Sequence, residues 1–109
     1  MATRLERTFA YYNRKYFGGL LTPIAVKWSE TLDPDVLGTF EGDVIKLNAK
    51  FKSLGQIWRL TLIHEMAHLK VQDHPDEIKA KSYNARTHSS VWQKEMKRLA
   101  NAGAFKLLW

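Results

Sequence analysis

Hydrophobic residues recur at helical spacing near the start of the chain and then alternate with polar residues in a shorter segment. From Thr3 to about Phe17 an apolar residue comes every three or four positions, Thr3 can cap the start, and a Gly-Gly pair follows the end. After a proline, residues 24–29 place Ile, Val and Trp on one face of an extended segment. This pattern predicts an N-terminal helix followed by a strand.

The next apolar segments predict a hairpin and a long helix. Residues 37–41 and 44–48 read as short strands, and the Gly-Asp pair between them is typical of a hairpin turn. Downstream, Ser53 can cap a helix that the Asp-His-Pro segment 73–75 ends. The apolar positions of this helix form one stripe that we expect to face the core: Ile57, Leu60, Ile63, Ala67 and Val71.

The last third of the chain combines a polar segment with an amphipathic one. Residues 73–88 contain a proline and show weak periodicity, so we expect a connecting loop there, in which residues 78–83 could form a turn of helix. Ser90 and Gln93 have the spacing of a capping box, and apolar residues continue at helical intervals as far as Asn101. Together these elements predict one α+β domain over residues 1–109, in which a small, about three-stranded sheet packs against the long helix, with further helices at both ends.

Composition narrows the classes of protein that this chain can be. The 109 residues include no cysteine, which excludes disulfides, thiol catalysis and thiolate metal sites, so His and carboxylates must hold any transition metal. The net charge of +6 favours a polyanionic partner such as DNA, although scattered basic residues also simply solvate helix faces. No stretch has the length of a signal sequence or a membrane span, so we expect a monomeric cytoplasmic protein without a membrane partner.

The segment 64–68 reads His-Glu-Met-Ala-His and lies within the predicted long helix. Residues four apart on a helix share a face, so the imidazoles of His64 and His68 can bind one metal ion. Glu65 can then act as general base toward a water on that ion, whose pKa zinc lowers from about 15.7 to about 7. This arrangement predicts hydrolysis of a peptide bond. In the alternative, both imidazoles are hydrogen-bonded core groups and Glu65 is solvated.

Catalytic zinc takes three protein ligands and keeps one position open, so a third ligand must lie outside the motif. The downstream candidates are His74, His88, Asp73, Asp76, Glu77 and Glu95. His74 has the spacing of the metzincin pattern, but Val71 replaces the glycine at which that pattern turns sharply. His88 comes just before a predicted capped helix, which can present it from a defined position. We therefore favour His88 and keep His74 as its rival.

Several segments together resemble the SprT-like metallopeptidase family, the Spartan/SprT family of zinc proteases. Residues 12–21 are similar to the family's N-terminal helix and its glycine-containing exit, and residues 24–28 and 44–48 resemble two of its strands. Residues 64–68 match the family's motif, and residues 88–92 resemble a downstream segment with a His, a small residue and an aromatic. The resemblance extends over most of the chain.

The resemblance implies that His64, His68 and His88 bind Zn²⁺ and that Glu65 is the catalytic carboxylate. It also implies a zincin-like fold and an association with DNA, as in proteases that act on DNA–protein crosslinks. The chain departs from the family in two respects. Ser89 stands where the family often has glycine, and the cysteines of the zinc ribbon that follows the protease domain in many members are absent.

Other residues suggest weaker roles. Three of the four tryptophans fall in predicted strands or helices and are expected to pack in the core rather than stack on bases, whereas the role of Trp109 stays open. Tyr83 and Arg86 come shortly before the favoured third ligand and can stabilise a tetrahedral oxyanion. Lys79 and Lys81 can contact phosphate or an acidic substrate, but solvation explains them more simply.

The sequence therefore predicts a zinc-dependent endopeptidase that acts on protein or peptide substrates, including proteins bound or crosslinked to DNA. A non-enzymatic, zinc-stabilised nucleic-acid-binding module is the alternative, which the positive charge favours and the intact Glu65 opposes. A protease that acts as a toxin or on host proteins would share the chemistry and differ only in its substrate.

Overall fold

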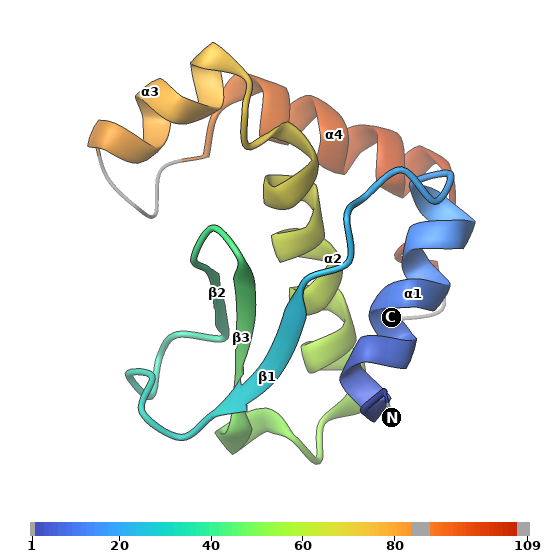
Figure 1. Cartoon of the computed structure of the whole chain (residues 1–109), viewed down its shortest axis with the longest axis vertical. Helices are drawn as coiled ribbons and strands as arrows, with labels where there is room; N and C mark the ends of the chain where they lie inside the picture. The colour runs from blue at the N-terminus through green and yellow to red at the C-terminus, as the bar shows by residue number, and fades with distance from the viewer. Residues whose placement is uncertain (1, 84–87, 107–109) are drawn as a thin grey trace.

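The computed structural model describes residues 2–83 and 88–106, which form four α-helices and a three-stranded mixed sheet (Figure 1). In chain order the elements are α1 (Arg4–Tyr16), β1 (Ala25–Ser29), β2 (Gly38–Phe40), β3 (Val44–Asn48), a 3₁₀ helix (Ala49–Phe51), α2 (Gly55–Val71), α3 (Pro75–Tyr83) and α4 (Ser90–Asn101). Helix α2 contacts β2 and β3 on one side and α4 on another. The predicted α+β class, with a small sheet against the long helix, is confirmed.

Helix α1 starts and ends close to the predicted residues. The Thr3 hydroxyl accepts a hydrogen bond from the backbone of Glu6, and the Glu6 carboxylate accepts one from the backbone of Thr3, which completes a capping box. After the helix, Gly18 and Gly19 have φ angles of 61° and 73°, which glycine adopts without steric cost. The buried Asn13 side chain then bonds to the backbone that follows, so the chain turns back toward the sheet.

The sheet has the strand order β1-β3-β2, in which β1 runs parallel and β2 antiparallel to β3. Strands β2 and β3 form the predicted hairpin, whose turn contains Gly42 with a φ of 76°. Ile45 and Leu47 of the central strand β3 are fully buried. Strand β2 lies at one edge of the sheet and pairs with β3 on its inner side.

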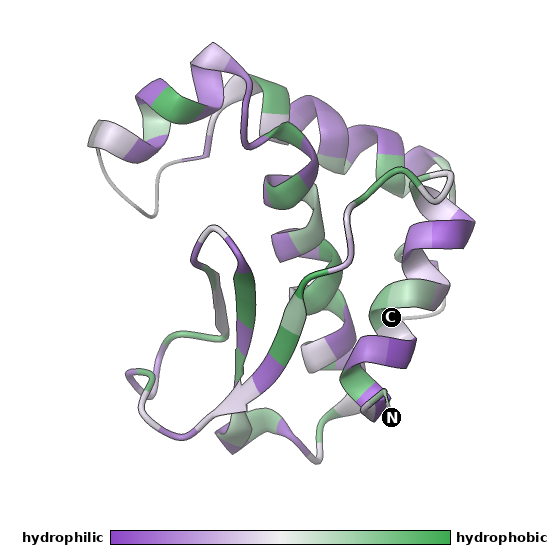
Figure 2. Cartoon of the chain, in the orientation of Figure 1, coloured by the Kyte–Doolittle hydropathy of each residue, from purple (hydrophilic) through white to green (hydrophobic). Residues whose placement is uncertain are grey.

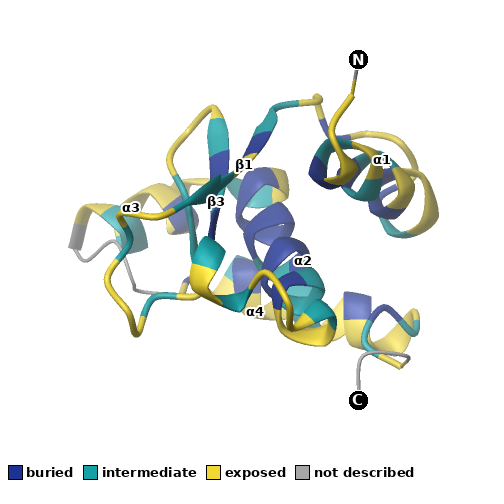
Figure 3. Cartoon of the chain, turned by 90° about the horizontal axis from the view of Figure 1, so that it is seen from below, coloured by how far each residue is buried: buried dark blue, intermediate teal, exposed yellow. Residues whose placement is uncertain are grey.

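Helix α2 approaches β2 so closely that position 38 has no room for a side chain. A Cβ atom at Gly38 would lie 2.7 Å from Cγ2 of Thr61 and 2.9 Å from the carbonyl oxygen of Lys46. Figure 3 shows that most of α2 is buried. Its buried residues are Trp58, Thr61, Leu62, Ile63, Glu65, Met66, Ala67, His68 and Leu69.

Two predictions about α2 are wrong in detail. The expected apolar stripe holds for Ile63 and Ala67, which are fully buried, and for Leu60 and Val71, which pack against the core. It fails at Ile57, which is 37% exposed, whereas its neighbour Trp58 is 3% exposed. The helix packs against both the sheet and α4, and two such contacts bury a wider surface than one stripe. The expected cap at Ser53 is absent because Leu54 is the N-cap residue and makes no side-chain hydrogen bond there.

Helix α3 occupies residues that the sequence predicts to be a loop, so this prediction is wrong for positions 75–83. Pro75 is the first helical residue, where a missing N–H has no cost, and Asp76 in the first turn suits the helix dipole. The sequence did not predict this helix because a charged side chain is buried and an apolar one is exposed. The charged Glu77 is 2% exposed, whereas Ile78 is 56% exposed, so the helix carries no apolar stripe.

Helix α4 begins with a cap one residue before the predicted one. The hydroxyl of Ser89, not of Ser90, accepts the hydrogen bond from the backbone N–H of Trp92. The tryptophans pack as expected: Trp58 and Trp92 are buried in the core, and the partly buried Trp28 meets Trp58 edge-on at 5.7 Å between ring centroids.

Hydrophilic and hydrophobic residues alternate along α1 and α4 (Figure 2), as in helices that pack by one side. Leu5 and Phe9 are buried on α1, and Leu99 is buried on α4. In the part of the chain that the structure describes, no helix combines the length and the apolar character that crossing a membrane requires.

Candidate metal centre

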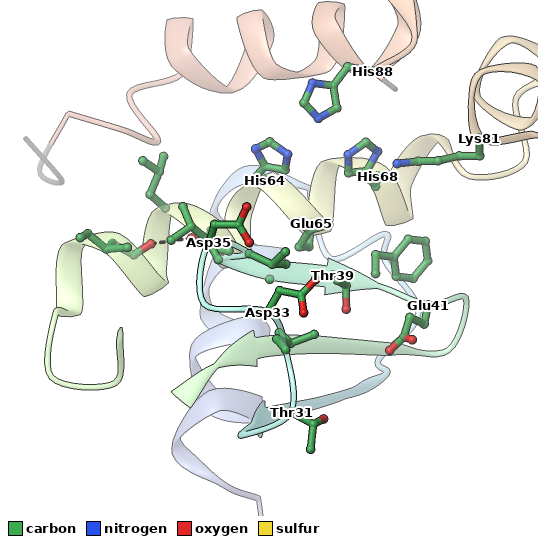
Figure 4. Close-up of a pocket in the computed structure, with 18 residues that line it drawn as sticks. Thr31, Asp33, Asp35, Thr39, Glu41, His64, Glu65, His68, Lys81 and His88 are labelled. Atoms are coloured by element: carbon green, nitrogen blue, oxygen red, sulfur yellow. Dashed lines mark hydrogen bonds between the residues drawn. The ribbon is translucent and has the colours of Figure 1, made fainter. Parts of the chain in front are cut away.

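Two histidines project from one side of α2, and a third, two positions before the start of α4, faces them (Figure 4). His64 and His68 are one helical turn apart, with ring centroids separated by 5.4 Å. The centroid of the His88 ring lies 5.1 Å from that of His64 and 5.4 Å from that of His68. One ring nitrogen of each histidine lies within 4.8 Å of the others. The fold thus brings the three favoured ligands into one cluster.

The rival ligands lie apart from this cluster or bond to other groups. His74 is exposed, and its Nδ1 accepts a hydrogen bond from the backbone of Asp76. Asp73 and Asp76 are exposed, and the Glu95 carboxylate binds two basic side chains. Among residues 2–83 and 88–106, the three clustered histidines are the one group of His and acidic side chains spaced to hold a metal.

Trp92 supports all three histidines from α4. Its ring stacks on His88 with centroids 3.9 Å apart and on His68 with centroids 5.0 Å apart, and its Nε1 donates a hydrogen bond of 3.3 Å to the carbonyl of His64. This residue belongs to the site, although the sequence suggests only a core role for it. The sequence feature that indicates this role is its spacing: Trp92 comes four residues after His88, in the first turn of the helix that follows.

A buried carboxylate on α3 contacts the same cluster. Oε2 of Glu77 lies 2.7 Å from Nδ1 of His68, and both side chains are 3% exposed. Its other oxygen, Oε1, accepts a hydrogen bond of 2.6 Å from the hydroxyl of Ser89. Glu77 was a candidate ligand in the sequence, but here both of its oxygens bond to protein groups. Because a carboxylate only accepts, it directs the His68 proton to Nδ1 and leaves Nε2 free for a metal.

Glu65 follows His64 on α2 and faces the cleft below the histidines (Figure 4). The residue is 7% exposed, and burial raises the pKa of its carboxyl to about 7, against a smaller opposing effect of the positive charge on Lys81. A carboxyl group with this pKa can take up and release a proton near neutral pH.

Burial favours the neutral form of all three imidazoles. Burial, together with the smaller effects of the adjacent His68 and His88, lowers the pKa of His64 to about 4. Burial also lowers the pKa of His68 to about 4, against the raising effect of its hydrogen bond to Glu77. The pKa of His88 is lowered as well, mainly by burial. Neutral imidazole is the form that binds metals, so the cluster needs no deprotonation first.

The histidines and Glu65 lie at one end of a cleft of about 890 Å³. The cleft runs between α2 and a wall formed by β2 and the segment 31–37 that precedes it. Away from the histidines its lining combines aliphatic side chains, such as Leu37, Ile57 and Leu60, with the acidic side chains of Asp33, Asp35 and Glu41. The cleft therefore joins the histidine end to a part in which aliphatic and acidic side chains are mixed.

The weaker candidates have varied positions. Lys81 on α3 lines the cleft beside His68 (Figure 4), whereas Lys79 is exposed on the same helix. Arg86, the Tyr83 side chain and Trp109 lie outside the described residues.

The donor set suits a catalytic metal centre. Three neutral imidazole nitrogens converge at one point. The carboxyl of Glu65 lines the cleft beside them but does not belong to the cluster. Catalytic Zn²⁺ typically takes three protein ligands of this kind and leaves one position open toward the substrate. The residues at this end of the cleft therefore fit a zinc ion.

The chain has a clear family match. The family model described as SprT-like matches residues 5–107, a range that contains the three histidines, Glu65 and Glu77. No curated protein and no solved structure matches the chain.

Proposed function

This chain belongs to the SprT-like family, and from that premise we propose that it is a zinc-dependent endopeptidase. The observation that carries the proposal is the cluster of three neutral histidines next to a buried carboxyl, at one end of a cleft. A metallopeptidase of the His-Glu-x-x-His type needs histidines that bind zinc and a carboxyl group within reach of a metal-bound water.

In this proposal His64, His68 and His88 hold the zinc ion through one nitrogen each. When bound, zinc supplies a Lewis acid that polarises a carbonyl and makes water a stronger acid. The chain's own contribution is to keep the imidazoles neutral and fixed: α2 sets the spacing of two of them, and Trp92 stacks against His88.

Glu65 is the proposed general base. It takes a proton from the attacking water and passes that proton to the amine that leaves when the peptide bond breaks. The raised pKa of about 7 suits both transfers, because the group then gains and loses a proton at similar free energy near neutral pH.

The shape of the cleft favours an extended peptide segment as substrate. Strand β2 lines the cleft and is an edge strand, so its backbone can pair with an extended chain. The aliphatic wall near Leu37 and Ile57, which are 45% and 37% exposed, can then cover an apolar side chain of that segment. We propose unfolded or flexible parts of proteins as the substrate class.

The distribution of charge supports proteins bound to DNA as one source of such segments. Residues 30–43 hold five acidic side chains and no basic one, and several of them line the cleft. Exposed basic residues lie instead on the helices, such as Arg14 on α1 and Lys94 and Lys97 on α4. A polyanion would be repelled from the cleft and attracted to the helices, which leaves the cleft free for a protein.

The test compares Glu65→Gln with Glu41→Gln, which alters an exposed carboxylate at the edge of the same cleft. Both variants should bind about one zinc per chain, and Glu65→Gln alone should lose at least about 100-fold in the rate of cleavage. Substrates should include free and DNA-crosslinked proteins, with and without single-stranded DNA.

Two results would overturn the proposal. Cleavage by Glu65→Gln at the wild-type rate would remove the carboxyl from the mechanism. DNA binding that survives chelation, with no cleavage of any unfolded or DNA-bound protein, would favour the non-enzymatic nucleic-acid-binding module instead.

A further inference from the structure

Glu77 is a buried charged residue that the proposed reaction does not use. It lies on α3, is 2% exposed and does not itself line the cleft. Among the ion pairs of the described residues, its partner is His68. Burying a carboxylate is costly unless strong hydrogen bonds compensate. Its two bonds, of 2.7 Å to His68 and 2.6 Å to Ser89, are short enough to be charge-assisted.

The two partners of Glu77 come from different parts of the metal centre. His68 belongs to the pair on α2, whereas Ser89 is the next residue after His88. The Ser89 hydroxyl also accepts the backbone N–H of Trp92 and so caps α4. One carboxylate therefore connects the helix that carries two histidines to the helix start that carries the third.

We propose that Glu77 is a positioning residue that sets the tautomer of His68 and, through Ser89, holds His88 in place for the metal. This inference rests on the proposed zinc site. It also gives a reason for Ser89, because glycine, which the family often has there, would offer Glu77 no hydroxyl.

A purely structural role for Glu77 would predict a different result, and the chain offers a matched control for it. Glu95 on α4 is 6% exposed and connects α4 to α2 through a 3.0 Å ion pair with Lys70, much as Glu77 connects α3 to α2. It also binds Arg98 but none of the three histidines. Loss of either carboxylate should weaken packing between helices, but only loss of Glu77 should change the affinity of the folded protein for zinc.

The experiment measures the zinc affinity of the folded protein by competition with a chromophoric chelator, for wild type, Glu77→Gln, Ser89→Ala and Glu95→Gln. We expect Glu77→Gln to bind zinc about 10- to 100-fold more weakly and Ser89→Ala about fivefold more weakly. We expect Glu95→Gln to bind like wild type. The double variant Glu77→Gln/Ser89→Ala should lose less zinc affinity than the product of the two single losses, because both residues act through the same hydrogen bond.

A second readout needs no metal. Nitrogen NMR of His68 in the metal-free protein should report a proton on Nδ1 in wild type and a mixture of tautomers in Glu77→Gln, because the amide of Gln can donate as well as accept. If Glu77→Gln fails to fold, Ser89→Ala still tests the same connection.

The outcomes separate this inference from the proposed function. Zinc affinity of Glu77→Gln equal to that of wild type, or an equal loss in Glu95→Gln, would overturn the positioning role and leave the zinc site intact. A wild-type protein that binds no zinc would overturn both.

Discussion

The three histidines of the cluster are held in three different ways. His68 is 2% exposed and hydrogen-bonded to Glu77. His64 is half-buried, and its carbonyl accepts a hydrogen bond from Trp92. His88 is exposed and stacks on the Trp92 ring. Substitution of His88 should therefore disturb folding least and report most directly on metal binding.

His88→Ala should lose zinc affinity by more than about 100-fold, because loss of a ligand costs more than loss of a ligand's hydrogen-bond partner. His74→Ala, a change at an exposed histidine of the same chain, should keep wild-type affinity. Zinc content after dialysis and chelator competition measure both. Retention of zinc by His88→Ala together with its loss in His74→Ala would assign the third ligand to His74.

The shifted pKa values of Glu65 and of the histidines should have opposite effects on how the stability of the metal-free protein changes with pH. The pKa values of His64 and His68 fall to about 4 on folding, so the unfolded chain binds more protons between that pH and about 6.5, and stability rises with pH there. The pKa of Glu65 rises to about 7, so the folded chain binds more protons from about 4.5 up to that pH, and stability falls.

Glu65→Gln removes only the second effect. Relative to wild type, the metal-free variant should therefore gain free energy of unfolding as the pH rises from about 4.5 to about 7. Urea unfolding at several pH values, with a chelator present, measures this difference. A difference that stays constant with pH would mean that folding does not shift the pKa of Glu65.

At the scale of elements, the contact between α2 and β2 forms the part of the cleft nearest the histidines. Strand β2 can approach α2 because Gly38 has no side chain, and Thr61 fills the space opposite. Helix α3 contributes in another way, since it covers His68 with a carboxylate rather than with an apolar face. The first contact depends on Gly38 and the second on Glu77, so a single substitution at either position should disturb it.

Gly38→Ala should destabilise the protein by about 1–3 kcal/mol, because the new methyl group meets backbone as well as side-chain atoms that cannot all move. Gly55→Ala is the matched control. There the nearest atom is Nη1 of the flexible Arg59, at 2.8 Å, and alanine suits a helix better than glycine. Urea unfolding should give a clear loss for the first and little change for the second; equal effects would contradict this account of position 38.

At the scale of the whole molecule, the proposed zinc ion would tie together elements that lie far apart in the chain. Its ligands come from α2 and from His88, two positions before α4, and Glu77 adds α3 to the same cluster. A chain of 109 residues has limited core to stabilise such an arrangement. Metal binding should therefore contribute to the stability of the fold.

Removal of zinc should lower the melting temperature. A ligand present at about 1,000 times its dissociation constant stabilises the folded state by about 4 kcal/mol, which corresponds to roughly 15 °C or more in a domain of about 100 residues. Differential scanning calorimetry before and after chelation, with metal content checked in both samples, measures the shift. An unchanged melting temperature after confirmed metal removal would show that metal binding and folding are not coupled.

Local features of the sequence were enough to predict most helices and strands, and also the part of the site that lies on α2. Helix α1, the hairpin and the end of α2 follow from caps, glycines and spacing, which act over a few residues. The relation of His64, Glu65 and His68 follows from one helical turn. Helix α3 was missed because its signal is a buried charge, which has meaning only beside its partner His68.

The sequence by itself thus determined the α+β class and the His-Glu-x-x-His segment, because both depend on interactions between near neighbours in the chain. Only the tertiary structure decided that His88 and not His74 joins the pair, that Trp92 supports all three rings, and that Glu77 and Ser89 connect α3 to them. Apart from the stacking of Trp92 on His88, these contacts join residues 9 to 28 positions apart, and their formation depends on how whole helices pack.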